Sequence, residues 1–130
     1  MAQIQLVVVT PEETALEAAV DFVAVPLEDG ELGVLPGRAP MIGRLGYGEM
    51  RLRFGSQVDR YFVDGGFVQI ADNVVSVLTS RAVPAAKIDR EAASNQLSEA
   101  LALKPNSDEL FESRDKLESQ ARALLRVARG

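Results

Sequence analysis

Residues 30–40 read GELGVLPGRAP, and this stretch decides how the rest of the chain can be arranged. Three glycines and two prolines fall within eleven residues, but the apolar Leu32 and Val34 alternate with them, so the segment does not read as a flexible linker. Gly33 and Gly37 allow backbone angles closed to other residues, while proline fixes φ and removes a hydrogen-bond donor. The pattern predicts a rigid ribbon that runs over the surface and pins Leu32 and Val34 to a core.

Two charged side chains of this ribbon, Glu31 and Arg38, are expected to face outward. Leu35 and Ala39 each precede a proline, which pushes them toward extended conformations and keeps the ribbon stretched. The alternative is that the segment is an ordinary crossover between the sheets of a sandwich. The choice between the two depends on the rest of the sequence.

The composition of the chain excludes several classes of function. The chain has 130 residues, of which 47% are hydrophobic and 25% charged, as in one ordinary globular domain or a small domain with an appendage. The net charge of -5 argues against nucleic acid as the main partner. The absence of cysteine and histidine removes disulfides, Cys/His metal sites and Ser-His-Asp catalysis. A metal site made of carboxylates alone stays open, although no calcium-loop spacing is present.

No part of the sequence has the pattern of a targeting or membrane-spanning segment. The N-terminus lacks the charged-then-apolar layout of a signal peptide, and the longest apolar runs are too short to cross a bilayer. We therefore expect a soluble protein that reaches a membrane only through a partner.

The first two-thirds of the chain has the period-two pattern of β-strands. Residues 49–54 alternate strictly, residues 55–56 are a two-residue hairpin signal, and residues 72–73 mark another tight turn. A helix over residues 11–20 is an alternative, but the β-branched residues beyond it favour strands. We expect strands over residues 4–9, 16–27, 49–54, 57–63, 67–71 and 74–80, with a break at residues 64–66. Turn signals about every eight to twelve residues predict an all-β sandwich or barrel.

The pattern becomes helical after residues 82–86. Asp89 is placed to cap a first helix, Lys104-Pro105-Asn106 to end it, and Asn106 or Ser107 to cap a second helix. The expected inward faces are Ala93, Leu97, Ala100 and Leu101 in the first helix, and Leu110, Leu117, Ala121, Leu124 and Ala128 in the second. Because the connection is short, the helices form an antiparallel hairpin. The sequence therefore predicts a β-sandwich domain over residues 1–84 followed by a helical hairpin over residues 88–130.

The second helix carries a stripe of arginines near its end. Arg122, Arg126 and Arg129 lie at i, i+4 and i+7 and therefore share one face. Acidic residues come first along this helix and arginines last, so the pattern complements the helix dipole, which is one explanation. The other explanation is a basic stripe for an acidic partner surface, because the planar guanidinium group pairs with carboxylates bidentately.

Two local motifs at this separation resemble the epsilon subunit of F-type ATP synthase, whose mitochondrial counterpart is called delta. The first is the ribbon at residues 30–40, which is similar to the glycine-rich segment of that family. The second is Gly65-Gly66-Phe67 followed by NVVSVL at residues 73–78. The order, the separation and the length all match, and the resemblance covers essentially the whole chain.

The resemblance implies a non-catalytic rotor-stalk subunit that couples proton flow to ATP synthesis. In the family the sandwich touches the gamma subunit and the ring of c subunits, so the interface candidates here are Glu31, Leu32, Gly33 and Arg38. The family's hairpin switches between a compact form and an extended form, which reaches the alpha/beta catalytic head and blocks hydrolysis. The arginine stripe would meet the acidic loops of that head. Such a subunit lies peripherally on the cytoplasmic face of the bacterial inner membrane, or on the stromal face of the thylakoid in a plastid.

Some bacterial members of the family bind ATP in the compact form through a motif that begins Ile/Leu-Asp-x-x-Arg-Ala. Ile88, Asp89 and Ala93 match this motif, but Ala92 stands where the arginine would pair with phosphate. Asp89 is also explained as a helix cap. We therefore expect no cofactor, and ATP as a regulatory ligand stays an open alternative.

Two other classes of function are alternatives to this prediction. Acid–base catalysis would use the clustered carboxylates of Glu28, Asp29 and Glu31, but no nucleophile or base partner stands out beside them. A free-standing sandwich that binds a protein or peptide is the second alternative. A sugar-binding platform is disfavoured, because the chain has no tryptophan and only 5% aromatic residues.

Overall fold

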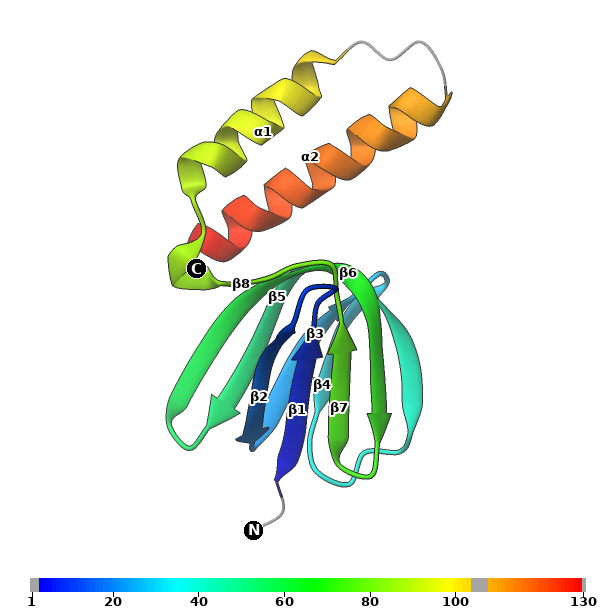
Figure 1. Ribbon diagram of the computed structural model, residues 1–130, viewed down its shortest axis with the longest axis vertical. Coiled ribbons are helices and arrows are strands. Elements are labelled where there is room, and N and C mark those ends of the chain that lie inside the picture. Colours follow the sequence, from blue (N-terminus) through cyan, green and yellow to red (C-terminus); the bar gives the residue numbers. More distant parts are fainter. Residues whose placement is uncertain (1–2, 104–107, 130) are drawn as a thin grey trace.

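The computed structural model describes residues 3–103 and 108–129 as a β-sandwich that carries a helical hairpin at one end (Figure 1). The described residues form eight strands, joined in the order β2-β1-β7-β6-β5-β3-β4, with β8 paired to β6. The strands are β1 (Ile4–Val9), β2 (Thr14–Val20), β3 (Phe22–Leu27), β4 (Gly30–Val34), β5 (Met41–Phe54), β6 (Gln57–Ala71), β7 (Val74–Leu78) and β8 (Ala82–Pro84). The predicted fold class, a sandwich followed by a two-helix hairpin, is confirmed.

Two long strands let the sheet fold over into two layers. β5 and β6 have 14 and 15 residues, and they pair with each other along almost their whole length. The end of β6 also pairs with β7, which lies parallel to β1, whereas the end of β5 pairs with β3. Figure 1 shows the long strands curving from one layer to the other. The space between the layers is filled by a buried apolar cluster of Ile4, Leu6, Val8, Val20, Val23, Val25, Val34, Leu45, Met50, Leu52, Val63, Val68, Ile70, Val75 and Val77.

The strand break predicted at residues 64–66 is wrong, because β6 continues through it. Gly65 and Gly66 have φ angles of 70° and 107°, which other residues rarely adopt. A Cβ atom on Gly66 would collide with the carbonyl oxygen of Leu78. The glycine pair lies between the part of β6 that pairs with β8 and the part that pairs with β7. It therefore redirects the strand and admits β7, where the sequence pattern indicated an end.

Other boundaries also differ from those predicted. The alternative of a helix over residues 11–20 is wrong, since β2 pairs antiparallel with β1. The predicted strand over residues 16–27 is divided into β2 and β3 around Asp21, whose carboxylate accepts a 2.8 Å hydrogen bond from the N–H of Gly55. The two predicted tight turns are confirmed at residues 55–56, which join β5 to β6, and at residues 72–73, where Asp72 and Asn73 both have positive φ.

The helical hairpin consists of α1 (Arg90–Ala102) and α2 (Asp108–Arg129), and it follows a short 3₁₀ helix, η1 (Ala85–Lys87). Asp89 caps α1 as predicted, because its side chain accepts a 3.0 Å hydrogen bond from the N–H of Ala92. The C-terminal end of α2 returns to the sandwich, whereas the other end of the hairpin projects away from it (Figure 1). The predicted helix end and cap at residues 104–107 lie outside the described residues.

The predicted inward faces of the two helices are correct only in part. Ala93, Ala100, Ala121 and Leu124 are buried as expected, but Leu101 is 51% exposed and Leu117 is 39% exposed. Ala123 and Val127 are buried although they are absent from the predicted face. The reason is that α2 packs against the sandwich as well as against α1, so its buried face is wider than a two-helix seam. Neither α1 nor α2 is both long and apolar enough to span a membrane.

Candidate functional site

The ribbon at residues 30–40 begins as β4, which lies at the edge of the sheet and pairs with β3. Val34 is buried and Leu32 packs partly buried against the core, while Glu31 and Arg38 lie at the surface. Gly33 lies against the ring of Phe22, which would be within 3.2 Å of a side chain at this position. Glu31, Leu32 and Gly33 therefore lie on one short edge strand, with Leu32 turned largely inward, whereas Arg38 lies beyond the end of that strand.

The rest of the ribbon is tied to the turn between β6 and β7. Gly37 has a φ of +87° and its N–H donates a 2.7 Å hydrogen bond to Asn73 Oδ1. The guanidinium of Arg38 reaches the Sδ atom of Met41, at 3.7 Å. The ribbon is thus held at both ends, so its surface has a defined shape.

Glu31 has a partner within the chain. Its carboxylate accepts hydrogen bonds of 2.6 and 3.3 Å from the two terminal nitrogens of Arg51 in β5, a bidentate arrangement. These bonds with Glu31, followed by those with Glu49, raise the pKa of the Arg51 guanidinium. Glu31 is therefore exposed, as expected, but Arg51 holds its carboxylate in place.

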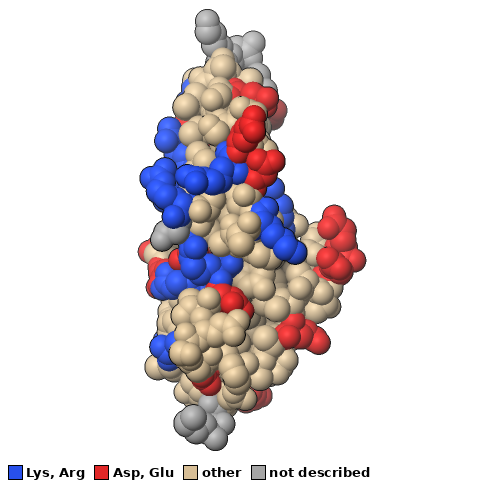
Figure 2. Space-filling model, turned by 90° about the vertical axis from the view of Figure 1, so that its left-hand side faces the viewer, with Lys and Arg blue, Asp and Glu red and all other residues tan. Residues whose placement is uncertain are grey.

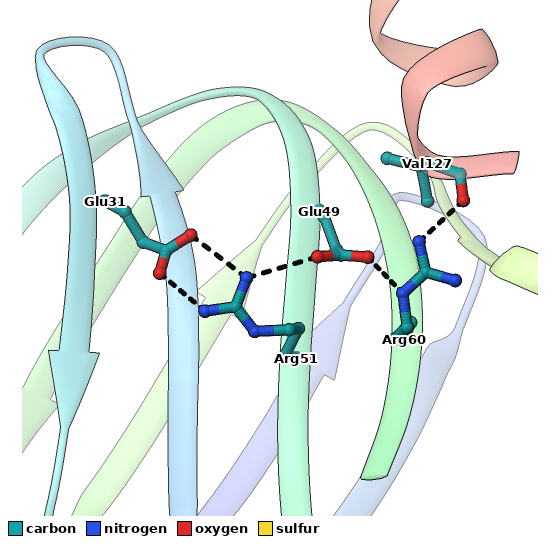
Figure 3. Close-up of polar contacts among 5 residues, drawn as sticks. All are labelled: Glu31, Glu49, Arg51, Arg60 and Val127. Carbon is teal, nitrogen blue, oxygen red and sulfur yellow. Dashed lines mark hydrogen bonds and ion pairs between the residues drawn. The ribbon is translucent and has the colours of Figure 1, made fainter. Parts of the chain in front are cut away.

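The pair of Glu31 and Arg51 is the first part of a longer row of alternating charges (Figure 3). Arg51 Nη1 donates at 3.2 Å to Glu49, and the other oxygen of that carboxylate accepts from Nε of Arg60 in β6. Arg60 Nη2 then donates at 2.7 Å to the main-chain carbonyl of Val127 in α2. The row therefore runs from the ribbon, across β5 and β6, to the end of the hairpin.

The hairpin meets the sandwich at a second apolar cluster, which we call the junction. Phe62 of β6, completely buried, forms its centre with the buried side chains of Ala93, Ala123, Leu124 and Val127. Its partly buried members are Tyr47, Val83, Ala85, Ile88 and Leu125. The junction is small, and two of its five buried residues are alanines.

Polar contacts around Asp64 border this junction. Asp64, whose side chain is only 9% exposed, accepts a 2.8 Å hydrogen bond from Gln120 Nε2 of α2 and lies 3.6 Å from Arg81. The Arg81 guanidinium also lies 5.3 Å from the centre of the Phe62 ring. One buried carboxylate therefore joins the hairpin to both the strand and the segment before β8.

The three arginines of the predicted stripe are all exposed along the final turns of α2. Arg122 pairs with Glu118 one turn earlier, at 3.3 Å, while Arg126 and Arg129 lie in the last turn. Figure 2 shows basic side chains gathered over the lower hairpin and its contact with the sandwich, with acidic side chains toward one edge. This arrangement agrees with the helix dipole and also leaves a basic surface available to a partner.

Ile88 and Asp89, the nucleotide-binding candidates, both have structural roles. Ile88 packs against the junction, and Asp89 is the cap of α1. The position of the missing motif arginine, Ala92, is exposed in the first turn of α1. The structure thus explains both candidates without a nucleotide.

The carboxylates considered for acid–base catalysis are engaged in ion pairs at the surface. Glu28 lies 4.0 Å from Arg44, with both side chains at least 60% exposed, and Glu31 is bound to Arg51. Among the described residues, no group of three or more acidic side chains could hold a metal ion. These contacts are those of surface ion pairs.

The structure reveals an exposed apolar surface on the sandwich that the sequence analysis did not predict. It lies on the outer side of β5, β6 and β7, and we call it the outer face. Phe67 pairs across the sheet with Leu78 on one side and with Arg44 on the other, and the Arg44 guanidinium lies 5.6 Å from its ring centre. The exposed fractions are 72% for Ile42, 49% for Phe67, 48% for Leu78 and 37% for Val74. In the sequence, these strands carry apolar residues on both of their sides. Such a pattern predicts a strand whose two faces are both covered, and it is the signal that could have revealed the outer face.

Comparisons with known proteins agree across sequence and structure. The family model for the β-sandwich domain of the ATP synthase delta/epsilon chain matches residues 3–85. The ATP synthase epsilon chain of Rhodopirellula baltica is 52% identical over 126 residues, which cover 97% of this chain and 98% of the relative. That of Granulibacter bethesdensis is 44% identical over 111 residues, covering 85% and 82%. A chain in the mitochondrial ATP synthase of Euglena gracilis, solved as an OSCP/F1/c-ring assembly, superposes with a TM-score of 0.86 at 28% identity, covering 95% of this chain and 80% of that one.

Proposed function

The chain belongs to the ATP synthase delta/epsilon chain family, and we propose that it couples proton translocation to ATP synthesis as a central-stalk rotor subunit. It is a non-catalytic subunit of the complex. The observation that carries this proposal is that the similarity to an epsilon chain extends through the hairpin and covers almost the whole of both chains. A free-standing binding module is not favoured, because it would not require the hairpin to match as well.

We place the contact with the c ring at the ribbon. Glu31, Leu32 and Gly33 belong to the edge strand β4, whose backbone is anchored by β3, and Arg38 follows in the segment that Gly37 ties to Asn73. Charged groups held on a rigid edge suit a lasting contact with the ring, because little side-chain or backbone order is lost on binding. Arg38, farther along the ribbon, supplies an exposed cation, so the ribbon as a whole presents groups of either sign.

We place the contact with the gamma subunit on the outer face. Ile42, Phe67 and Leu78 are exposed apolar side chains on neighbouring strands, with Arg44 beside Phe67, and such a composition suits a protein-binding surface. The outer face continues directly from the ribbon, since β5 starts at Met41. One partner could therefore cover the outer face while another meets the ribbon.

The hairpin is proposed to restrain ATP hydrolysis by leaving the sandwich. We treat residues 1–84 and 88–130 as separate domains joined at the junction. The small junction and the exposed Leu101, Leu103 and Phe111 at the far end of the hairpin fit an element whose docking is reversible. In the extended form, the stripe of Arg122, Arg126 and Arg129 would face the alpha/beta catalytic head.

We further propose that the subunit is peripheral to a membrane and associates with it only through the complex. We expect it on the cytoplasmic face of a bacterial inner membrane, or on the stromal face of a thylakoid, as for the family that it resembles. No cofactor is expected, and ATP as a regulatory ligand at Ile88 and Asp89 stays an open alternative, against which the replacement of the motif arginine by Ala92 argues.

Size-exclusion chromatography with the gamma subunit from the same source tests the proposal. The full chain should co-elute with gamma at micromolar concentration, and Phe67→Asp should weaken the complex by about tenfold or more, because it buries a charge in the interface. Val58→Asp is the matched control, since Val58 lies in the same strand and is 53% exposed but is outside the outer face. Failure of the unaltered chain to bind gamma would overturn the subunit assignment, and equal binding by F67D would overturn the placement on the outer face.

A further inference from the structure

Arg60 contacts the hairpin at a group that every helix leaves unsatisfied. The last carbonyls of a helix have no partner within it and carry the negative end of the helix dipole. Val127 is two residues before Arg129, the last residue of α2, and its carbonyl accepts the 2.7 Å hydrogen bond from Arg60 Nη2. A cation of the sandwich therefore caps the helix that it docks.

The position of Arg60 depends on Glu49, because the Nε atom of Arg60 donates to that carboxylate. The side chains of Glu49 and Arg60 are 22% and 29% exposed, so this pair is less screened by water than a fully exposed pair. Glu49 also accepts from Arg51 at 3.2 Å, so two arginines share one carboxylate.

How strongly Arg51 binds the carboxylate of Glu49, which it shares with Arg60, depends in turn on Glu31. Arg51 directs both terminal nitrogens to Glu31 and only one of them to Glu49. If a partner engages the carboxylate of Glu31, Arg51 loses its main acceptor and turns to Glu49. Arg51 then competes with Arg60 for Glu49, and the bond from Arg60 to Val127 loses its support.

We propose that Glu31, Arg51, Glu49 and Arg60 form a relay through which a hydrogen-bond donor or cation bound at Glu31 weakens the docking of α2 (Figure 3). Arg60 and Glu49 are positioning residues for the hairpin, and Glu31 is the input. The inference rests on the proposed function only for the identity of the partner at Glu31. The relay itself is a property of the isolated chain.

The chain contains no cysteine, so one introduced thiol can report the docking of α2. Val127→Cys places a thiol of similar size in the junction, where Val127 is 3% exposed. A thiol reagent reaches it only when the hairpin leaves the sandwich, so the labelling rate measures the undocked population. Val8→Cys, in the completely buried sandwich core, gives the rate for unfolding of the whole molecule.

In the V127C background, Arg60→Met should raise the labelling rate by about tenfold or more, since a charged donor to a helix carbonyl is lost. Glu31→Gln imitates the engaged carboxylate and should raise the rate by about two- to fivefold, the range of a partly exposed ion pair. Glu28→Gln is the matched control. Glu28 is three residues before Glu31 and pairs with Arg44 at the surface, not with Arg51. The labelling rate of E28Q in the V127C background should therefore equal that of V127C alone.

Three results would overturn the proposal. R60M labelled at the parent rate would show that Arg60 does not hold the hairpin. E31Q labelled at the E28Q rate would show that the relay does not extend to Glu31. An effect of E31Q that persists undiminished at about 1 M salt, where the Debye length is about 3 Å, would show that it is not electrostatic. All of these measurements use the chain without gamma or the c ring, so their failure is distinct from failure of the proposed function.

Discussion

The sandwich core and the junction beneath the hairpin are both buried and apolar, but they differ in scale. The core cluster has fifteen buried residues, all of them Val, Leu, Ile or Met, whereas the junction has five, of which two are alanines. Apolar burial contributes roughly 25 cal/mol per Å², so the core holds far more of the stabilising free energy. The junction instead adds polar contacts from Arg60 and Gln120. The comparison supports the proposal that the sandwich is a permanent scaffold from which the hairpin can undock.

The largest expected effect comes from removing a side chain of the sandwich core. Leu6 is completely buried, and Leu6→Ala should lower the free energy of unfolding of the sandwich by about 2–5 kcal/mol. Urea unfolding followed by the circular dichroism of the sheet measures the change. Ile42→Ala, at 72% exposure on the outer face, is the control and should change it by less than about 0.5 kcal/mol. A loss below about 1 kcal/mol for L6A would contradict the contrast in scale.

A smaller effect, confined to docking, is expected at the junction. Leu124 is 5% exposed, and Leu124→Ala should weaken docking of α2 by about 2 kcal/mol while the urea midpoint of the sandwich stays nearly constant. Thiol labelling in the V127C background separates the two quantities. Leu117→Ala, in the same helix but 39% exposed, should leave both unchanged. If L124A lowered the sandwich midpoint as much as L6A, the two regions would form one cooperative unit.

Removing the cap of α1 should have a still smaller effect on stability. Asp89→Ala removes the acceptor of the Ala92 N–H and should cost about 1 kcal/mol of hairpin stability. The helical signal at 222 nm should melt at lower temperature, with the sheet transition unchanged. Asp89→Asn keeps an acceptor and should behave like the parent chain. A shift of the sheet transition in D89A would mean that Asp89 supports more than the hairpin.

The smallest effect appears only at alkaline pH. Partial burial, followed by the charge of Asp59, raises the pKa of Tyr61, which lines the sandwich beside β8. In Tyr47→Phe, which leaves one tyrosine, absorbance at 295 nm should titrate above the value near 10 found in urea. Since the folded pKa is raised, the stability from Tyr61 is complete below pH of about 10 and is lost as pH rises through the folded value. If the absorbance of Tyr61 titrated with the same midpoint pH in buffer and in urea, its pKa would not be raised by the fold.

Local signals in the sequence predicted the architecture well. The β-branched run of β1, the turns at residues 55–56 and 72–73 and the capping Asp89 each depend on near neighbours, and all are present. Errors arose where distant segments decide the outcome. Gly65 and Gly66 read as a break, but the approach of Leu78 from β7 makes them part of a continuous strand.

The candidate site was predicted less completely for the same reason. Exposure of Glu31 and of the arginine stripe followed from periodicity and turn chemistry. The contacts of Glu31 with Arg51, and of Arg60 with Val127, join residues that are 20 and 67 positions apart. One sequence contains no signal for such pairs. The burial of Ala123 and Val127 likewise depends on how α2 meets the sandwich, which a seam between two helices does not reveal.

The parallel pairing of β1 with β7 also sets the order in which this molecule can assemble during synthesis. Residues 5–9 must wait for residues 74–78, so the sandwich closes only through contacts of long sequence separation, which form slowly. Until β7 is made, one edge of β1 is open and exposed to mispairing. The hairpin comes last and folds through near-neighbour contacts. The ribosome therefore adds the hairpin to a scaffold that can already be closed, and a chain stalled before residue 74 would be a substrate for chaperones.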